Sequence, residues 1–211
     1  MLTRRTMVLG AAGIAVATNA AAIPSTIPMA LGPFYPVVKP SEDDADLTRL
    51  AGHQARAKGQ VIELMGRVLD GTGKPVSGAR IELWQANAAG RYAHHGDQHP
   101  APLDLDFQGY GVQKTDADGH YRFLTIHPGA YPAGDYMRAA HLHFDVEGRY
   151  SRLVTQMYFK GDRWLHQDRT LHQDLKTRED RYPDSIFAAE LGAGAEPSAR
   201  RLGFDLVLYD G

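Results

Sequence analysis

The stretch VIELMGRVLDGTGKPVSGARIELW, residues 61–84, decides the fold of this chain. Residues 61–69 are rich in aliphatic side chains, and DGTGKP at residues 70–75 contains the Gly and Pro residues that are typical of a turn. Residues 79–84 then alternate between apolar and polar side chains, as a strand with one buried face does. The stretch therefore predicts a strand, a turn and a second strand.

The same pattern of short apolar segments and turns continues toward the C-terminus. After the turn DADG at residues 116–119, strand patterns recur at residues 121–126, 141–146, 153–159 and 204–209. Long helical periodicity is missing, and residues 185–191 are the single candidate for a helix. Six or more short strands with Gly-rich turns predict an all-β fold, an antiparallel β-sandwich.

We divide the chain into an export signal (residues 1–22), an N-terminal arm (residues 23–58) and one β-sandwich domain (residues 59–211). Arg4 and Arg5 precede a short apolar core, and small residues at 20–22 follow it, as in bacterial signals of the twin-arginine route. We therefore expect a periplasmic protein. The apolar core is too short to span a bilayer, so we expect no stable membrane span. Prolines interrupt the arm and predict an irregular path.

Composition narrows the class of protein. The chain has 211 residues, 43% of them hydrophobic and 23% charged, a globular composition that excludes a disordered or coiled-coil protein. The formal net charge is −2 and no long basic run occurs, so we expect no nucleic-acid partner. Cysteine is absent, so nitrogen and oxygen atoms must hold any metal, and the 10 His and 10 Tyr can supply them.

The pair His141 and His143 is a candidate metal site. On a strand, side chains at i and i+2 project from the same face, so both imidazoles can converge on one ion. In a chain with 10 histidines such a pair also arises by chance. A pair of surface or hydrogen-bonded histidines is therefore the alternative.

The surrounding residues carry a resemblance to a known family. Four motifs occur in family order, namely WQANAAGRY (84–92), DQHPAPLD (97–104), TIHPGAYP (125–132) and TQMYF (155–159). Through them the chain resembles the intradiol ring-cleavage dioxygenases, and among these the iron-bearing β chains of protocatechuate 3,4-dioxygenases. The resemblance runs from GPFYP (32–36) to about residue 162, with a weaker tail to residue 209.

The resemblance implies a complete metal site. Carried over residue by residue, the family's Fe(III) ligands fall on Tyr92, Tyr131, His141 and His143. Two phenolates and two imidazoles are hard and borderline donors, which suit ferric iron better than a soft metal. The ordinary pKa of tyrosine is about 10, so only a strong Lewis acid would keep both phenols deprotonated at neutral pH.

The family's mechanism implies three catalytic roles. Tyr131 is expected to leave the iron when a catechol binds and to accept one substrate proton, while Tyr92 stays bound. Arg138 is expected to stabilise negative charge on the substrate ring, with a surface ion pair as the alternative. Gln156 is expected to lie near the reacting oxygen, with a hydrogen bond to a strand edge as the alternative.

The implied reaction uses O2 to cleave protocatechuate or a related catechol between its two hydroxyl-bearing carbons, giving a muconate. His94 and His95 are the candidates to meet a substrate carboxylate. The segment 132–137 is shorter than in typical β chains, which leaves the choice of catechol open. The family's protocatechuate enzymes assemble from two related chains, so a homo-oligomer and a related second chain are both open.

Two other classes of protein remain as alternatives. A non-catalytic, transthyretin-like β-sandwich binding module would fit the pattern of residues 66–84. A zinc hydrolase using His141 and His143 would need a third histidine or a carboxylate, and no HExxH motif occurs. Separately, LHQD occurs at residues 165–168 and again at 171–174. We expect a solvated loop or helix surface there rather than a second metal site.

Overall fold

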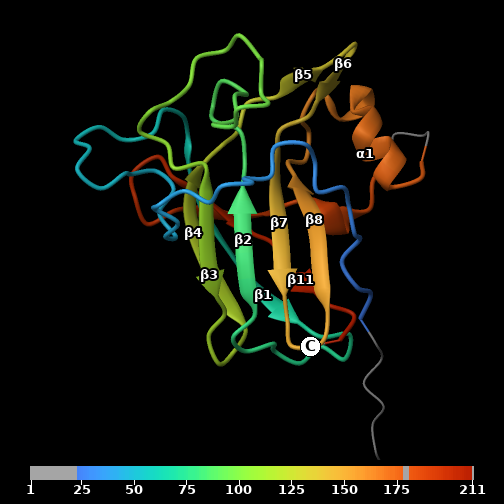
Figure 1. Cartoon of the computed structure of the whole chain (residues 1–211). Coiled ribbons are helices and arrows are strands. Elements are labelled where there is room, and N and C mark those ends of the chain that lie inside the picture. The colour runs from blue at the N-terminus through green and yellow to red at the C-terminus, as the bar shows by residue number, and fades with distance from the viewer. Residues whose placement is uncertain (1–22, 178–180, 211) are drawn as a thin grey trace, which may run out of the picture.

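The computed structural model describes residues 23–177 and 181–210, which fold as a β-sandwich with long loops gathered at one end (Figure 1). The export signal predicted over residues 1–22 lies outside the described residues and stays a prediction. Among the described residues, no helix is long and apolar enough to cross a membrane.

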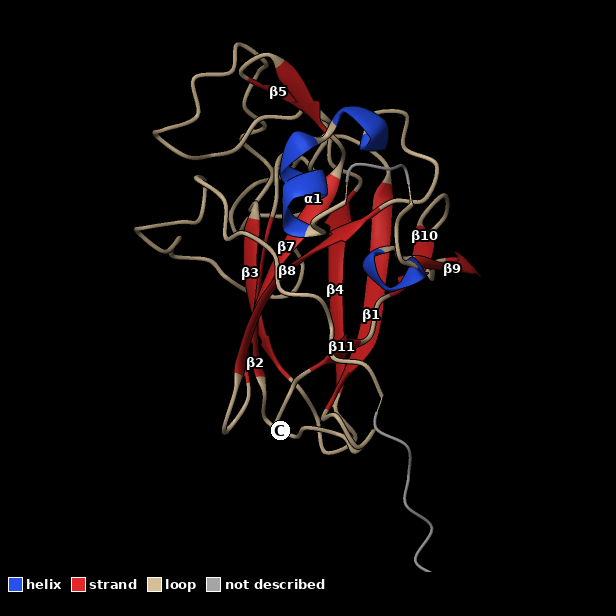
Figure 2. Ribbon diagram, turned by 90° about the vertical axis from the view of Figure 1, so that its right-hand side faces the viewer, coloured by secondary structure: helices blue, strands red, loops and turns tan. Residues whose placement is uncertain are grey.

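Two sheets face each other, as the side view in Figure 2 shows. The first sheet has β1 at its centre, with β4 on one side and β10 and β11 on the other, and β9 pairs with β10. Its strands are β1 (Val61–Leu69), β4 (His120–Ile126), β9 (Ala189–Ala193), β10 (Arg200–Gly203) and β11 (Leu206–Val207).

The second sheet has the order β3-β2-β7-β8. Its strands are β2 (Arg80–Trp84), β3 (Tyr110–Lys114), β7 (His141–Glu147) and β8 (Arg152–Tyr158). A hairpin of β5 (Tyr131–Ala133) and β6 (Tyr136–Arg138) stands at the end of the sandwich. The described helical segments are short, namely the 3-10 turns η1 (Leu165–Gln167) and η2 (Asp184–Ile186) and the helix α1 (Arg169–Asp174).

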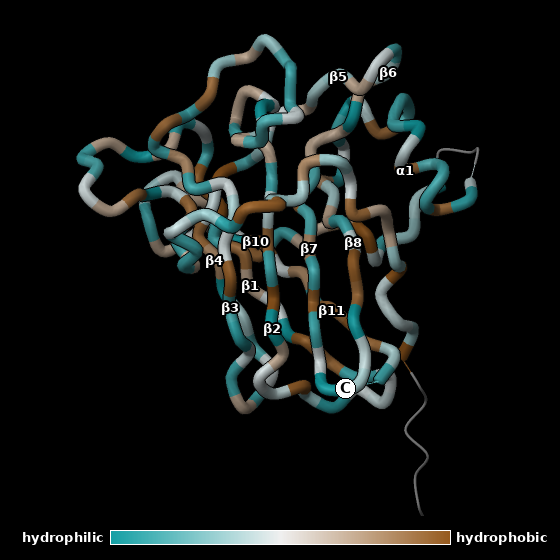
Figure 3. The backbone as a smooth tube through the Cα atoms, viewed as in Figure 1, coloured by the Kyte–Doolittle hydropathy of each residue, from teal (hydrophilic) through white to brown (hydrophobic). Residues whose placement is uncertain are grey.

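The core lies between the two sheets. Leu142, Phe144 and Val146 of β7 are fully buried there, packed with residues such as Ile81 of β2. Figure 3 shows the underlying pattern on β2, where polar and apolar positions alternate. Because successive side chains on a strand point to opposite faces, the histidines of β7 project from the face away from this core.

The prediction of an all-β sandwich is confirmed, and β1 has the predicted bounds 61–69. Most strand pairs are antiparallel, but β1 pairs in parallel with β10 and β11. The helix predicted at residues 185–191 is wrong, since η2 ends at Ile186 and β9 begins at Ala189. Pairing of β9 with β10 outweighs the helix propensity of this segment.

The arm, residues 23–58, follows an irregular path that starts along the free edge of β8 and continues beside β3 and β4. The Met29 N–H donates to the Val154 carbonyl at 2.9 Å. At Gly32 φ is +78°, and an added Cβ would lie 3.0 Å from Cε1 of His143. A residue without a Cβ is needed both for this left-handed backbone and for this close approach. The arm therefore covers the face from which His143 projects.

Candidate metal centre

The centre is built on the outer face of the second sheet, at the end where β2 stops and β7 starts. Register places Trp84, His143 and Gln156 side by side across β2, β7 and β8, and Tyr158 beside His141. All five side chains are buried. Loops that follow β2 and β4 rise over this end of the sheet and bring in further side chains.

Tyr92 lies in the loop after β2, Tyr131 begins β5 directly after the loop that follows β4, and hydrogen bonds hold the two loops together. The Gly129 N–H donates to the Asn87 carbonyl at 2.9 Å. Gly90 has a φ of +79°, and an added Cβ would lie 2.5 Å from the Ala130 carbonyl oxygen. Any larger residue there would push the loops apart, so glycine sets the spacing between the two tyrosines.

The four predicted ligands form a closed ring of side chains. Ring centroids lie 5.5 Å apart for Tyr92 and Tyr131, and 5.7 Å apart for Tyr131 and His141. They lie 4.7 Å apart for His141 and His143, and 6.3 Å apart for His143 and Tyr92. Two side chains of β7, one of the loop after β2 and one at the start of β5 thus surround one point.

The two imidazoles are prepared to accept a metal. Their Nε2 atoms face each other at 3.1 Å, and Nδ1 of His141 donates to the Ala139 carbonyl at 2.6 Å. That hydrogen bond leaves the Nε2 lone pair of His141 free. Burial, together with the charge of Arg138, lowers the pKa of both histidines well below its ordinary value, so both rings are neutral at neutral pH.

The tyrosines complete a donor set that fits ferric iron. The Tyr92 hydroxyl is buried and has no hydrogen-bond partner among the described residues, although the Tyr92 N–H donates to Asp97 at 2.7 Å. Burial raises the pKa of Tyr92 well above its ordinary value and also raises the pKa of Tyr131. An unpartnered phenol beside two imidazoles with free lone pairs is the arrangement that a cation of high charge would satisfy.

Arg138 and Gln156 lie together beside this ring. Nη2 of Arg138 donates to Oε1 of Gln156 at 2.7 Å and to the Tyr158 hydroxyl at 3.0 Å. Arg138 is buried, so the alternative of a surface ion pair is wrong. Burial disfavours its charge, but Tyr158, Tyr131 and Asp168 outweigh burial and raise the pKa of Arg138 above its ordinary value. Gln156 also donates through Nε2 to the Ala30 carbonyl at 2.7 Å.

Sequence reasoning missed Tyr158 and Asp168. Asp168 belongs to the first LHQD copy, which was expected to be solvated, yet its carboxylate is fully buried and pairs with Arg138 at 3.0 Å. The signal that the sequence offered was the leucine that begins each LHQD copy, at residues 165 and 171, and both leucine side chains are buried. Within the described residues, no three His, Asp or Glu side chains are placed to hold a metal.

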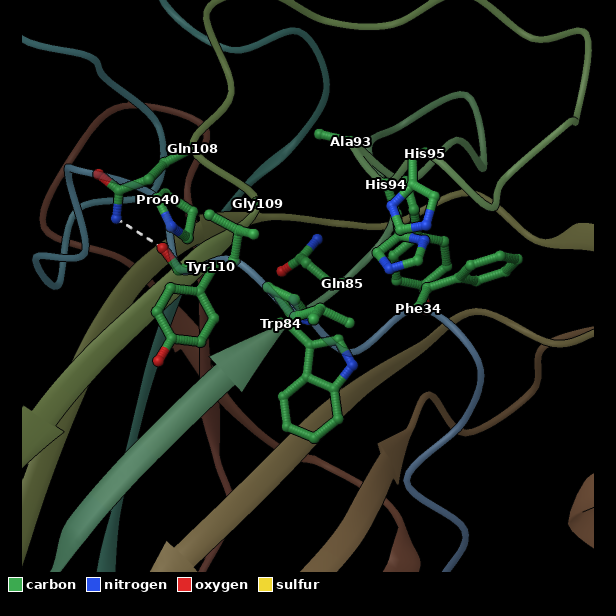
Figure 4. A pocket seen from close by; sticks show the side chains of 14 residues that line it. Phe34, Pro40, Trp84, Gln85, Ala93, His94, His95, Gln108, Gly109 and Tyr110 are labelled. Atoms are coloured by element: carbon green, nitrogen blue, oxygen red, sulfur yellow. Dashed lines mark hydrogen bonds between the residues drawn. The ribbon is translucent and has the colours of Figure 1, made fainter.

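A cavity of about 290 Å³ adjoins the centre (Figure 4). Tyr92 lies in its wall with Trp84, Phe34, His94 and His95. Phe34 packs on Tyr92 with centroids 4.7 Å apart, and His94 stacks on His95 at 4.5 Å. The lining contains no acidic side chain and no lysine or arginine, so an aromatic molecule fits its chemistry.

Comparison with known proteins agrees with this geometry. Residues 31–209 match the model of a dioxygenase family. The chain is 48% identical over 170 residues to the protocatechuate 3,4-dioxygenase beta chain of Burkholderia cepacia, covering 78% of this chain and 71% of that one. It is 36% identical over 159 residues to the 6-chlorohydroxyquinol 1,2-dioxygenase of Cupriavidus pinatubonensis, covering 68% of this chain and 54% of that enzyme.

Solved structures share the fold. Catechol 1,2-dioxygenase from Pseudomonas arvilla C-1 superimposes with a TM-score of 0.61 at 25% identity, over 87% of this chain and 62% of that one. The dioxygenase domain of a Streptomyces carbohydrate-binding fusion protein gives 0.64 at 24% identity, over 89% and 100% of the two chains. The family match and the 48% identical relative set aside the alternative of a non-catalytic binding module. The chain belongs to the intradiol ring-cleaving dioxygenase family and is an enzyme similar to protocatechuate 3,4-dioxygenase.

Proposed function

We propose that the chain is a non-haem Fe(III) dioxygenase that uses O2 to open protocatechuate or a related catechol between its hydroxyl-bearing carbons, giving a muconate. The observation that carries the proposal is the closed ring of Tyr92, Tyr131, His141 and His143 around one point. Ferric iron held there would supply a Lewis acid that binds the catechol and makes it reactive toward O2.

The residues around the ring have distinct tasks in this proposal. Tyr131 and Tyr92 are the groups that give up or take back protons, since both histidines are neutral and hydrogen-bonding fixes His141. Arg138 supplies a permanent positive charge beside the ring, where charge would develop on the substrate. Gln156 holds the guanidinium in place, and the arm and sheet exclude water from this side.

Protocatechuate is favoured as the substrate by the name of the 48% identical relative. Two other relatives are named for hydroxyquinols, so these and plain catechol are the competing substrates. In this proposal His94 and His95 would meet the carboxylate that distinguishes protocatechuate, because they are the basic side chains in the cavity wall beside Tyr92.

The experiment is a visible spectrum of the purified, iron-quantified protein before and after anaerobic addition of protocatechuate, catechol or hydroxyquinol. We expect a broad visible band from ferric tyrosinate that shifts when the catechol binds, followed by loss of the catechol when O2 is admitted. A colourless protein after iron reconstitution would overturn the proposal. Comparison of kcat/KM for the three substrates then ranks them.

We further propose export by the twin-arginine route, on the strength of Arg4 and Arg5 and the apolar stretch behind them. Fractionation of cells expressing the full chain, compared with the double variant Arg4→Lys, Arg5→Lys, tests this. Periplasmic protein that depends on the arginines is expected. Equal cytoplasmic retention of both would contradict it.

We also propose that the chain assembles, either with itself or with a related second chain. Support comes from the relative's name, which designates a beta chain. Light scattering on the purified chain is expected to give a mass above that of one chain if self-assembly suffices. A monomer that lacks activity until a second chain is added would point to the two-chain form.

A further inference from the structure

Asp168 sits where a loop, a helix and the candidate centre meet. It is fully buried and precedes α1, and its Oδ1 accepts a hydrogen bond from the Leu171 N–H at 2.9 Å. Its Oδ2 accepts from Nε of Arg138 and from the Ala139 N–H, each at 3.0 Å. A buried carboxylate must be paired and hydrogen-bonded, and these donors achieve both.

Both contacts of Oδ2 lead toward the ring of ligands. A guanidinium is rigid and planar, so holding Nε of Arg138 also fixes the direction of Nη2, which donates to Gln156 at 2.7 Å. Residue 139 is held on both sides, because its N–H donates to Asp168 and its carbonyl accepts from Nδ1 of His141 at 2.6 Å. One carboxylate thus orients Arg138 directly and His141 through a single residue.

The second LHQD copy supplies an equivalent anchor at the other end of α1. Oδ2 of Asp174 accepts from the Ala30 N–H at 3.2 Å. The Ala30 carbonyl in turn accepts from Nε2 of Gln156 at 2.7 Å. The helix therefore holds Arg138 through Asp168. Through Asp174 and the Ala30 backbone of the arm it also holds Gln156, so the two LHQD copies share the task of positioning these side chains.

We propose that Asp168 is a positioning residue for ring cleavage. It aims Arg138 at Gln156 and at Tyr158, beside the ring of ligands, and it acts through Arg138 without touching the substrate. The kinetic part of this proposal rests on the proposed dioxygenase function, whereas the orientation of Arg138 is a property of the metal-free protein.

The kinetic test uses Asp168→Asn and Asp168→Ser, because Asn and Ser are both good N-cap residues and should preserve α1. We expect kcat per bound iron to fall by about 10- to 100-fold, the range seen when an orienting partner is lost, with KM for protocatechuate within about 2-fold of the wild type. The matched control is Asp135→Asn, which removes the exposed ion pair with Arg169 on the same helix and should leave kcat unchanged.

A double-mutant cycle between Asp168 and Arg138 distinguishes a positioning role from a general loss of structure. In an Arg138→Met background, Asp168→Asn should lower kcat no further, because its target is already gone. The proposal would be overturned if Asp168→Asn had the kcat of the wild type. It would also be overturned if Asp168→Asn lowered kcat by the same factor in the Arg138→Met background as in the wild type. Arg138→Lys keeps the positive charge but lacks the planar guanidinium group, so its kcat should fall by a similar factor. Full activity of Arg138→Lys would overturn the positioning proposal, and this test remains available even if the Asp168 variants do not fold.

A measurement that needs no turnover distinguishes failure of the positioning role of Asp168 from failure of the proposed dioxygenase function. In ¹⁵N spectra of metal-free protein, the Nε–H of Arg138 should be protected from solvent exchange in the wild type and in Asp135→Asn, and unprotected in Asp168→Asn. Equal protection in all three would overturn the positioning role. A protected Arg138 in a wild type that cleaves no catechol would overturn only the proposed function.

Discussion

The indole of Trp84 lies flat against the imidazole of His143, with ring centroids 4.8 Å apart and planes inclined by 8°. The two residues are directly paired between β2 and β7, so the sheet itself sets the stacking. Trp84 is fully buried and limits how far the ring of His143 can turn. Position and orientation of a predicted ligand thus depend on a side chain that holds no metal.

Trp84→Leu should therefore weaken iron binding by about 10-fold, as loss of an orienting neighbour commonly does. Competition with a chelator, read from the visible band, measures the change. Trp164→Leu removes the other tryptophan of the chain, which packs in a separate cluster, and should retain iron like the wild type. Equal iron retention in both variants would show that the stacking does not matter.

Each tyrosine of the ring should contribute to the visible band. Tyr92→Phe and Tyr131→Phe remove one phenolate each, so both should lower and shift the absorption of the iron-loaded protein. Tyr110→Phe is the matched control, because the Tyr110 hydroxyl is also buried without a hydrogen-bond partner among the described residues yet lies outside the ring. A normal band in Tyr131→Phe would remove Tyr131 from the ligand set.

Iron uptake should release protons, one from each tyrosine ligand. Burial raises the pKa of Tyr92 and of Tyr131, so both phenols are protonated in the metal-free protein at neutral pH. The pKa values of His141 and His143 are lowered, so both rings are already neutral at neutral pH and release no proton when iron binds. Iron affinity should thus rise with pH. Calorimetry in buffers of different ionisation enthalpy counts the protons, and uptake without release would contradict tyrosinate ligation.

Glu82 should make stability depend on acid pH. Burial alone would raise its pKa, but Lys39, Tyr35 and Arg80 outweigh burial and lower the pKa from 4.5 to about 2. A lowered folded-state pKa adds stability above the unfolded value, and that stability is lost as the pH falls from about 4.5 toward 2. The contribution at neutral pH is on the order of 3 kcal/mol.

Glu82→Gln should therefore be less stable than the wild type at pH 7, with a gap that narrows on acidification. Urea unfolding at several pH values measures it. Asp184→Asn removes the exposed pair with Lys160 and should show no such gap. A gap for Glu82→Gln that is the same at pH 3 and pH 7 would rule out this ion-pair network as its source.

Gly32 and Gly52 have the same backbone conformation, so comparing them distinguishes the cost of backbone strain from the effect of a side-chain contact. Gly32 has a φ of +78° and faces His143, whereas Gly52 has a φ of +79° and nothing within 4 Å of an added Cβ. Alanine at either position should cost about 1 kcal/mol of unfolding free energy through the left-handed backbone. Gly32→Ala alone should also shift the visible band, because its methyl group would press on a predicted ligand. Equal spectra would contradict that contact.

Local patterns were sufficient to predict the strands that carry the centre. The alternation in residues 79–84 and 141–146 places apolar side chains on the face toward the core and polar side chains on the opposite face, and the structure has β2 and β7 there. The period-two geometry of a strand also places His141 and His143 together. The helix prediction at residues 185–191 failed because propensity is a weak preference, which pairing of β9 with β10 reverses.

Partners that are distant along the chain were not predictable. The buried carboxylate of Asp168 lies 30 residues from Arg138, and Ala30 lies 126 residues from Gln156. No local period marks such pairs, because their closeness follows from how sheet, arm and α1 pack. The polar composition of the repeat, with its His, Gln and Asp residues, predicted a solvent-exposed segment. The packing of Leu165 and Leu171 in a hydrophobic cluster turns the segment inward instead.

The sequence by itself determined the all-β fold, because strand and turn patterns depend on residue type and short spacing. Its motifs also carried the resemblance to a known family, and that resemblance identified the residues that surround the candidate centre. The tertiary structure decided how those residues meet. It closed the four rings around one point, buried Arg138 with Asp168, and stacked Trp84 on His143. These relationships arise only when segments remote in sequence share one low-dielectric interior, where unpaired charges and polar groups must find partners.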